Sequence, residues 1–140
     1  MSDPYELKRF VDAQEGVYEQ ACEELRTGRK RTHWMWFVFP QIRGLGSSPT
    51  AVRFAISGRE EARGYLEHPV LGSRLWECTR IVVGVEGRSV EEIFGYPDDL
   101  KFHSSMTLFA KAEAEEPGVF GRALEKYFGG EMDPETLERI

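Results

Sequence analysis

The least ordinary stretch of the chain reads His33-Trp34-Met35-Trp36-Phe37-Val38-Phe39-Pro40-Gln41. Its residues do not alternate between apolar and polar, so a strand with one face in water does not fit. A stretch that is apolar on all sides predicts a buried segment, either a short helix stopped by Pro40 or a buried strand. Helical patterns on both sides of the stretch favour the helix. We therefore expect a short buried helix within an all-α fold.

Helical patterns extend outward from this stretch in both directions. Residues 3–27 show apolar positions at a period near 3.6, opened by Asp3 and Pro4, with a bend expected near Gly16. Further helices are predicted over residues 50–56, 57–66, 69–85, 89–94, 98–110, 117–128 and from residue 133 onward. The expectation is a compact bundle of about seven or eight helices with short connections, forming a single domain over residues 1–140.

The composition is that of an ordinary globular chain. Of the 140 residues, 41% are hydrophobic and 14 are glycine, and the longest apolar run is far shorter than a membrane span of about 20 residues. A net charge of −6 argues against non-specific nucleic-acid binding. The N-terminus has no apolar signal segment, which predicts a cytoplasmic protein. Cys22 and Cys78 lie within apolar helical patterns and are expected to be buried, reduced thiols.

Basic residues next to the aromatic stretch suggest a binding site. The run 29–31 leads to His33, so cations that could meet a phosphate or carboxylate stand beside rings on which a planar group can stack. Gln41 is a plausible further polar contact. The alternative is that Trp34 and Trp36 are simply core and that the basic residues solvate a helix end, where the helix dipole favours positive charge.

A second polar cluster opens the helix expected over residues 98–110. Asp98, Lys101 and Ser105 would share one stripe of this helix, and a second stripe would hold Asp99, His103 and Thr107. A lysine near a serine could assist its deprotonation, and an Asp–His pair could orient an imidazole. The alternative is an ordinary first turn in which Lys101 pairs with Asp98 at the surface. The three histidines lie on separate segments, so neither a metal site nor a cofactor is predicted.

The chain resembles a known bacterial family. The resemblance rests on the stretch 33–41, on Gly44-Leu45-Gly46 with Ser48, on His68-Pro69-Val70-Leu71-Gly72, and on the run 98–109. The family is catalogued as domain of unknown function 1810, and the resemblance covers about residues 3–130. It implies a small, single-domain, multihelical fold and supplies no activity. Arginine often takes the position of His103 in the family pattern, which argues against that residue as a general base. The label calpastatin, sometimes attached to such proteins, names a disordered inhibitor and does not suit this aromatic-rich chain.

These observations lead to two hypotheses. The first is a domain that binds a small anionic ligand, nucleotide-like in one version, with hydrolysis left open, in a cleft between residues 30–41 and 98–105. Its ligand-binding residues would be Lys30, His33, Trp34, Trp36, Gln41, Lys101 and Ser105. The second is a non-enzymatic interaction module, in which the acidic part 113–140 or an exposed aromatic patch contacts a protein partner.

Overall fold

The computed structural model describes residues 3–113 and 118–140. These residues form ten helices, and their one β-type pairing is an isolated bridge between Ile42 and Ile56. The all-α prediction is confirmed, whereas the expected number of seven or eight helices was too low. The helices are α1 (Lys8–Gln14), α2 (Tyr18–Arg26), α3 (Met35–Val38), α4 (Pro49–Arg53), α5 (Arg59–Glu67), α6 (Leu71–Gly84), α7 (Val90–Phe94), α8 (Asp98–Ala112), α9 (Val119–Phe128) and α10 (Pro134–Arg139).

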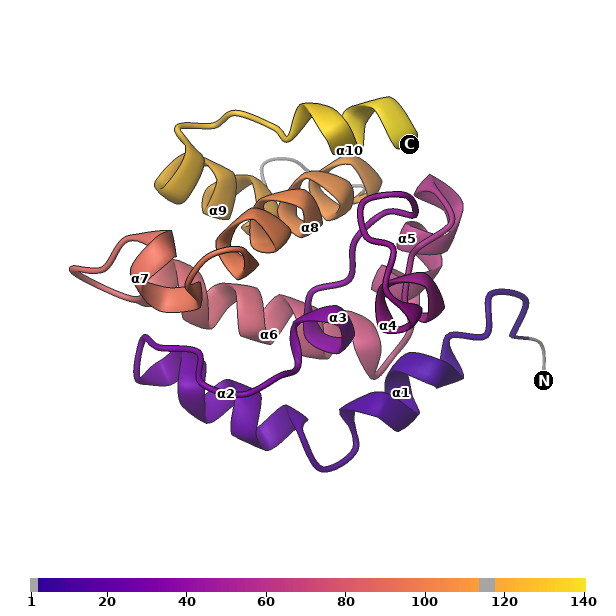
Figure 1. The fold of residues 1–140 in the computed structure, drawn as a ribbon, viewed down its shortest axis with the longest axis horizontal. Helices are drawn as coiled ribbons and strands as arrows, with labels where there is room; N and C mark the ends of the chain where they lie inside the picture. The colour runs from indigo at the N-terminus through magenta and orange to yellow at the C-terminus, as the bar shows by residue number, and fades with distance from the viewer. Residues whose placement is uncertain (1–2, 114–117) are drawn as a thin grey trace.

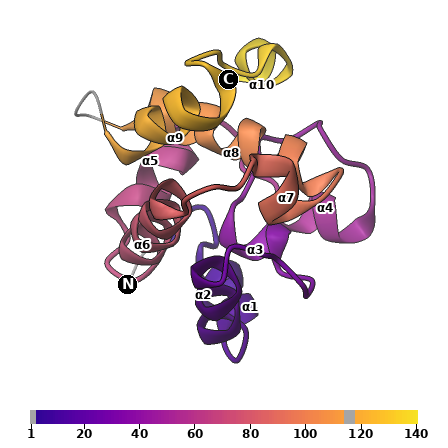
Figure 2. The same ribbon diagram turned by 90° about the vertical axis from the view of Figure 1, so that its left-hand side faces the viewer.

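The two longest helices, α6 and α8, organise the fold (Figure 1). α8 packs against α5, α7, α9 and α10, while α6 packs against α2, α5 and α9. The short helix α3 contacts α1 and α6 and lies above the α1–α2 pair in both ribbon views (Figures 1 and 2). Within the described ranges, no helix combines the length and apolar character that crossing a membrane requires.

The aromatic stretch forms the short buried helix that the sequence predicts. α3 covers Met35–Val38 and stops before Pro40, which lacks an amide hydrogen and restricts the residue before it. Phe39 is fully buried and packs edge-on against Phe94 and Phe102, with ring centroids 5.8 and 5.1 Å away. The stretch therefore joins α7 and α8 to the N-terminal helices in one hydrophobic core.

The single helix expected over residues 3–27 is two helices. Gly16 has a φ of 79°, a left-handed conformation that a residue without Cβ adopts readily, and it separates α1 from α2. Gln14, at the end of α1, is buried and donates hydrogen bonds to the Phe37 carbonyl (2.8 Å) and the Tyr65 hydroxyl (3.2 Å). The break lets the end of α1 reach α5 and the α3 backbone, a tertiary contact that helical periodicity does not reveal.

A buried glutamate on α2, Glu24, holds the segment that leads into α3. One carboxylate oxygen accepts hydrogen bonds from the amides of Arg31 (2.7 Å) and Thr32 (3.0 Å) and from the indole of Trp34 (2.9 Å). The other accepts from the Thr32 hydroxyl (2.6 Å) and the Gln20 amide (2.9 Å). Burial raises the pKa of Glu24, but the hydrogen bonds, led by that from the Thr32 hydroxyl, outweigh burial and lower the pKa to about 2.

The same segment starts at a glycine turn. Gly28 has a φ of 77°, and its amide and that of the next residue donate to the carbonyls of Leu25 and Glu24, which is the pattern of a Schellman motif. The Lys30 amide then donates to the Ile93 carbonyl of α7 at 2.7 Å. Lys30 is therefore positioned from two sides, by α2 and by α7.

Replacing Glu24 by glutamine is expected to destabilise the fold. The E24Q side chain keeps its volume but loses its charge and places an NH2 group against other donors, which removes on the order of 2–3 kcal/mol of unfolding free energy. The midpoint of thermal unfolding should fall by several degrees. Calorimetry of the wild type, E24Q and E23Q measures the effect, because Glu23 is the exposed neighbour on the same helix. Equal midpoints for E24Q and E23Q would show that the carboxylate does not hold the segment.

The Glu24 carboxylate also makes stability depend on pH in the acid range. Its pKa of about 2 in the folded protein lies below the ordinary value of 4.5. Its stabilisation is therefore complete above about pH 5 and is lost as the pH falls toward 2. In urea unfolding from neutral to acid pH, the wild type should lose on the order of 2–3 kcal/mol more than E24Q. Parallel curves of stability against pH for the two proteins would contradict this assignment.

Candidate functional site

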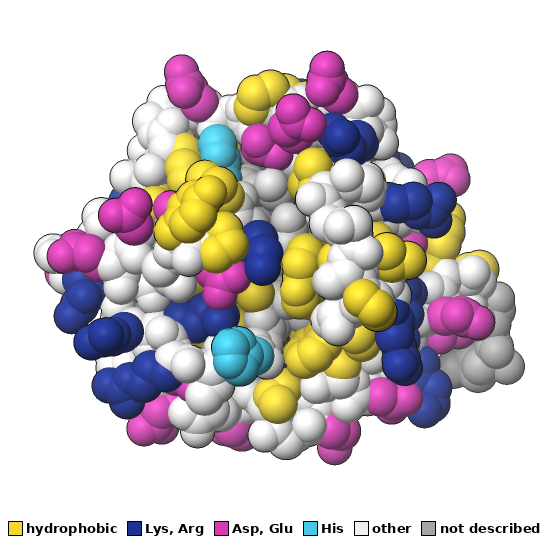
Figure 3. All heavy atoms as spheres, viewed as in Figure 1, with side chains coloured by type: hydrophobic (Ala, Val, Ile, Leu, Met, Phe, Trp, Pro, Cys, Tyr) yellow, Lys and Arg dark blue, Asp and Glu magenta, His cyan; other side chains and the backbone are white. Residues whose placement is uncertain are grey.

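A cavity of about 320 Å³ lies between the segment preceding α3 and the first turn of α8. Five of the predicted ligand-binding residues line it: Lys30, His33 and Trp34 from the segment before α3, Trp36 from α3 itself, and Lys101 from α8. The remaining lining residues are Met35, Phe37, Ser48, Thr50 and Asp98. On the face in Figure 3, basic, acidic, histidine and hydrophobic side chains meet around a hollow near the centre.

One carboxylate organises the charge in this cavity. Asp98 Oδ2 lies 2.8 Å from Lys30 Nζ, and Asp98 Oδ1 lies 3.2 Å from Lys101 Nζ. The Lys30 side chain is only 8% exposed and also donates to the Thr32 carbonyl at 2.7 Å, whereas that of Lys101 is 26% exposed. Two ammonium groups against one carboxylate leave a net positive charge in the cavity, which favours an anion there.

The two tryptophans have different roles around these lysines. Trp34 is 1% exposed, its indole N–H is bound to Glu24, and Lys30 Nζ lies 5.1 Å from the ring centroid. Trp36 is half-buried, with Lys101 Nζ 4.6 Å from its ring centroid, a cation–π arrangement. Trp34 is therefore mainly a core residue that also lines the cavity, and Trp36 is the aromatic wall with surface still accessible.

The loop after α3 closes on Trp36 because of a glycine. A Cβ at Gly46 would lie 2.9 Å from the Trp36 ring and 2.7 Å from the Ala51 side chain, so a larger residue would displace one of them. Beyond this loop, the Ser48 hydroxyl caps α4 by accepting from the Ala51 amide at 3.1 Å. Gly46 and the α4 cap thus fix the side of the cavity that carries Ser48 and Thr50.

The structure does not bring Gln41 and Ser105 into this cavity. Gln41 is 4% exposed, and its carbonyl accepts from the Ile56 amide at 2.9 Å beside the isolated bridge. Ser105 is fully buried, in a part of α8 that the core surrounds. Among the described residues, Gln41 Nε2 and Ser105 Oγ have no hydrogen-bond partner. Both are core residues, and Ser105 therefore cannot present its hydroxyl to a ligand held by Lys101.

The α8 stripe that contains His103 and Thr107 makes contacts that hold the fold together. His103 Nε2 lies 2.8 Å from the Glu131 carbonyl, and its ring stacks on Phe128 with centroids 3.9 Å apart and planes 8° apart. The Thr107 hydroxyl donates to the His103 carbonyl and accepts from the Asp133 amide. His103 thus faces the segment between α9 and α10, and this stripe docks that segment on α8. The ion pair between Lys101 and Asp98 that the alternative predicted is present, but it lies in the cavity, with the two side chains only 26% and 19% exposed.

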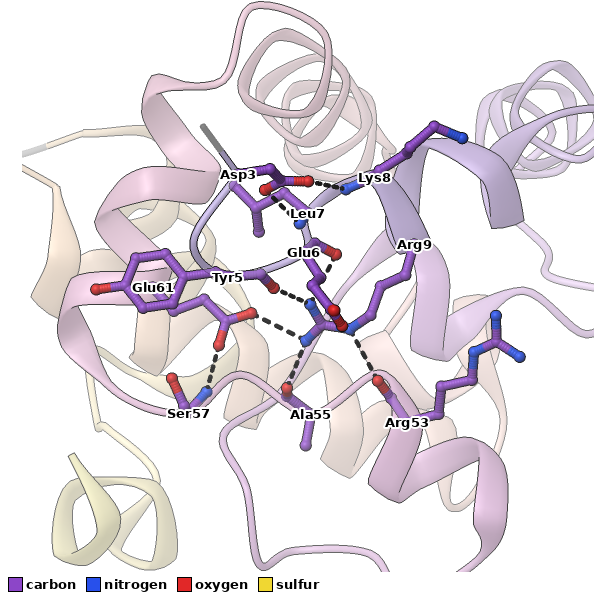
Figure 4. A network of polar contacts seen from close by, with 10 residues as sticks. All are labelled: Asp3, Tyr5, Glu6, Leu7, Lys8, Arg9, Arg53, Ala55, Ser57 and Glu61. Carbon is purple, nitrogen blue, oxygen red and sulfur yellow. Dashed lines mark hydrogen bonds and ion pairs between the residues drawn. The ribbon is translucent and has the colours of Figure 1, made fainter. Parts of the chain in front are cut away.

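Two other cavities have a weaker claim to be the site. One of about 910 Å³ borders α8 and α9, but Lys126 there already donates to the carbonyls of Val83 and Val85. Another, of about 510 Å³, lies over the network in Figure 4. There Arg9 donates to the Arg53 and Ala55 carbonyls and pairs with Glu61 at 2.9 Å. These cations serve to tie segments of the chain together.

Two residues that matter most at the site were not predicted as site residues. Asp98 was placed on one stripe with Lys101 and Ser105, and as a partner of Lys101, but it was not named among the ligand-binding residues. Glu24 carries no signal of its own, because α2 also contains other glutamates at exposed positions. Throughout the described ranges, no group of three or more His, Cys, Asp or Glu side chains could hold a metal ion.

Comparison with known proteins places the chain in a family. The family model described as "Protein of unknown function (DUF1810)" matches residues 4–140. Among solved structures, the chain is similar to the conserved hypothetical protein Rv1873 from Mycobacterium tuberculosis, with a TM-score of 0.95 and 62% sequence identity over 97% of this chain and 96% of that one. A search of curated proteins finds no match. The family model spans nearly the whole chain, and the chain therefore belongs to the DUF1810 family.

Proposed function

We propose that the chain binds a small anionic ligand with a planar group, nucleotide-like in its chemistry, in the cavity between α3 and α8. The observation that carries this proposal is that Lys30 and Lys101 converge on Asp98 beside the half-buried face of Trp36. An anionic group can take over part of the role of Asp98 toward Lys101, and a ring can stack on Trp36 or His33.

The size of the cavity supports a small ligand. Its volume of about 320 Å³ is at the low end of the roughly 300–1,000 Å³ that small-molecule sites occupy. A sugar phosphate or a mononucleotide suits this volume better than a dinucleotide does. The proposal concerns binding, and hydrolysis is not part of it. The cytoplasmic location expected from the sequence stays a prediction.

The interaction module remains the competing hypothesis because large apolar side chains are exposed. Tyr96 is 76% exposed, and Trp76, which lies outside the buried stripe of α6, is 50% exposed. Exposed aromatic side chains of this kind are enriched at protein interfaces. The ligand hypothesis is preferred because Lys30 is largely buried and is held by an ion pair with Asp98. A surface that only docks a protein partner does not require a lysine that is buried in this way.

A thermal-shift screen tests the proposal. The panel contains nucleoside monophosphates, sugar phosphates and small carboxylic acids, together with the matched nucleosides and sugars that lack the charge. A ligand at 100 times its Kd adds about 2.7 kcal/mol of stability, which raises the unfolding midpoint by several degrees. We expect shifts from anionic compounds and smaller ones from their uncharged counterparts. A flat response across the whole panel would favour the interaction module.

Charge variants at the cavity provide a sharper test on any compound that binds. K101Q removes a cation, so the affinity for an anion should fall by about tenfold or more. D98N removes the competing carboxylate, so the same affinity should rise several-fold. Lys111 is an exposed lysine at the other end of α8, and K111Q is the matched control with unchanged affinity. Isothermal titration calorimetry gives the Kd values. Weaker binding by D98N together with normal binding by K101Q would overturn the assignment of an anionic ligand.

A further inference from the structure

The two cysteines of the chain meet in the core although they are 56 residues apart. Cys22 lies on α2 and Cys78 on α6, with their sulfur atoms 3.9 Å apart. Both are free thiols, 2% and 0% exposed, as the sequence predicted for each of them separately. No sequence pattern predicted that they are in contact. Because α2 and α6 pack directly against each other, this contact is part of a helix–helix interface.

We propose that Cys22 and Cys78 are a reversible redox pair, which hydrogen peroxide converts into an intramolecular disulfide that joins α2 to α6. This inference concerns a modification site and does not depend on the proposed ligand. It accounts for a feature that packing alone does not require, namely that the only two thiols of the chain are each other's neighbours.

The geometry needs only a small adjustment to form this bond. A disulfide has its sulfur atoms about 2.05 Å apart, so the two sulfurs have to approach by roughly 2 Å. This movement has to come from rotation about the two Cα–Cβ bonds and from closure of the α2–α6 interface. No third cysteine competes for either sulfur.

The surroundings of the two thiols shift their pKa values in opposite directions. The hydrogen bond with Cys78, assisted by the Tyr18 hydroxyl and the charge of Arg26, lowers the pKa of Cys22 against the effect of burial. The hydrogen bond with Cys22 and burial both raise the pKa of Cys78. Tyr18, which is only half-buried, and Arg26, which is exposed, both interact with Cys22. In this proposal Cys22, which lies next to these groups, is the attacking thiolate, and the fully buried Cys78 is the resolving thiol.

The reaction has two balanced steps. The Cys22 thiolate attacks one oxygen of hydrogen peroxide, the O–O bond breaks, and the leaving hydroxide takes up a proton to become water, which leaves Cys22 as a sulfenic acid. The Cys78 sulfur then attacks the Cys22 sulfur, the S–O bond breaks, and the departing hydroxide takes the Cys78 proton to form a second water. Two thiols are oxidised and one peroxide is reduced. A dithiol reductant restores the starting state.

Intact mass measurement of the full chain tests the proposal. The reduced protein is treated with hydrogen peroxide and alkylated after denaturation. We expect a mass lower by two hydrogens, no alkylation, a Cys22–Cys78 cross-linked peptide after proteolysis, and full reversal by dithiothreitol. Since the bond closes a loop of 56 residues, the oxidised form should unfold at a temperature higher by on the order of 10 °C.

Serine variants assign the two roles. C78S should accumulate a sulfenic acid at Cys22 that dimedone traps, whereas C22S should keep its thiol under the same treatment. The wild-type mass alone decides the proposal if either variant folds poorly. Three results would overturn it: uptake of oxygen atoms without loss of hydrogens, disulfide-linked dimers in place of the internal bond, or two intact thiols under conditions that oxidise glutathione in the same sample.

Discussion

The candidate site depends on the buried carboxylate of Glu24. This side chain accepts five hydrogen bonds, three of them from groups in the segment just before α3 and one from the indole of Trp34. Without this carboxylate, two backbone amides and the indole N–H would lose their hydrogen-bond partner. Leaving such groups unpaired away from water lowers the stability of the folded protein. With the carboxylate in place, the chain turns from α2 into the aromatic helix with Lys30 held beside the first turn of α8. The cavity exists because this turn is fixed.

Much of the fold could be predicted because its signals are local. The period of apolar residues and the stop at Pro40 identified helices that the structure contains. The helix predicted over residues 89–94 is also present as α7, and Ser89 and Glu92 form a capping box at its start. The predicted number of helices was too low for a tertiary reason. The break at Gly16 is stabilised by the contact of Gln14 with α3 and α5, and nothing in the local sequence specifies those partners.

Most of the site residues that were predicted are neighbours along the chain as well as in space, and Lys101, which reaches the cavity from α8, is the exception. Lys30 and Trp36 are only six residues apart along the chain, and both line the same cavity. Ser105 lies one helical turn after Lys101, which suggested that both face a ligand. However, α8 is enclosed by several helices, and a stripe on such a helix does not identify a face toward solvent. The importance of Glu24 was hidden because its partners come from a loop whose path the sequence does not specify.

The cavity joins two parts of the fold that are anchored independently. Its Lys30 side is held by α2 through Glu24, and its Lys101 side belongs to α8, which packs on α5, α7, α9 and α10. The Lys30–Asp98 ion pair at 2.8 Å spans the boundary between them. Cys22 lies on the same short helix as Glu24, two residues earlier, and α2 meets α6 through Cys78. α2 therefore takes part in two separate contacts: Cys22 meets Cys78 of α6, and Glu24 accepts hydrogen bonds from the segment that carries Lys30. Lys30 is held in the cavity both by this segment, through its contacts with Glu24, and by its own ion pair with Asp98.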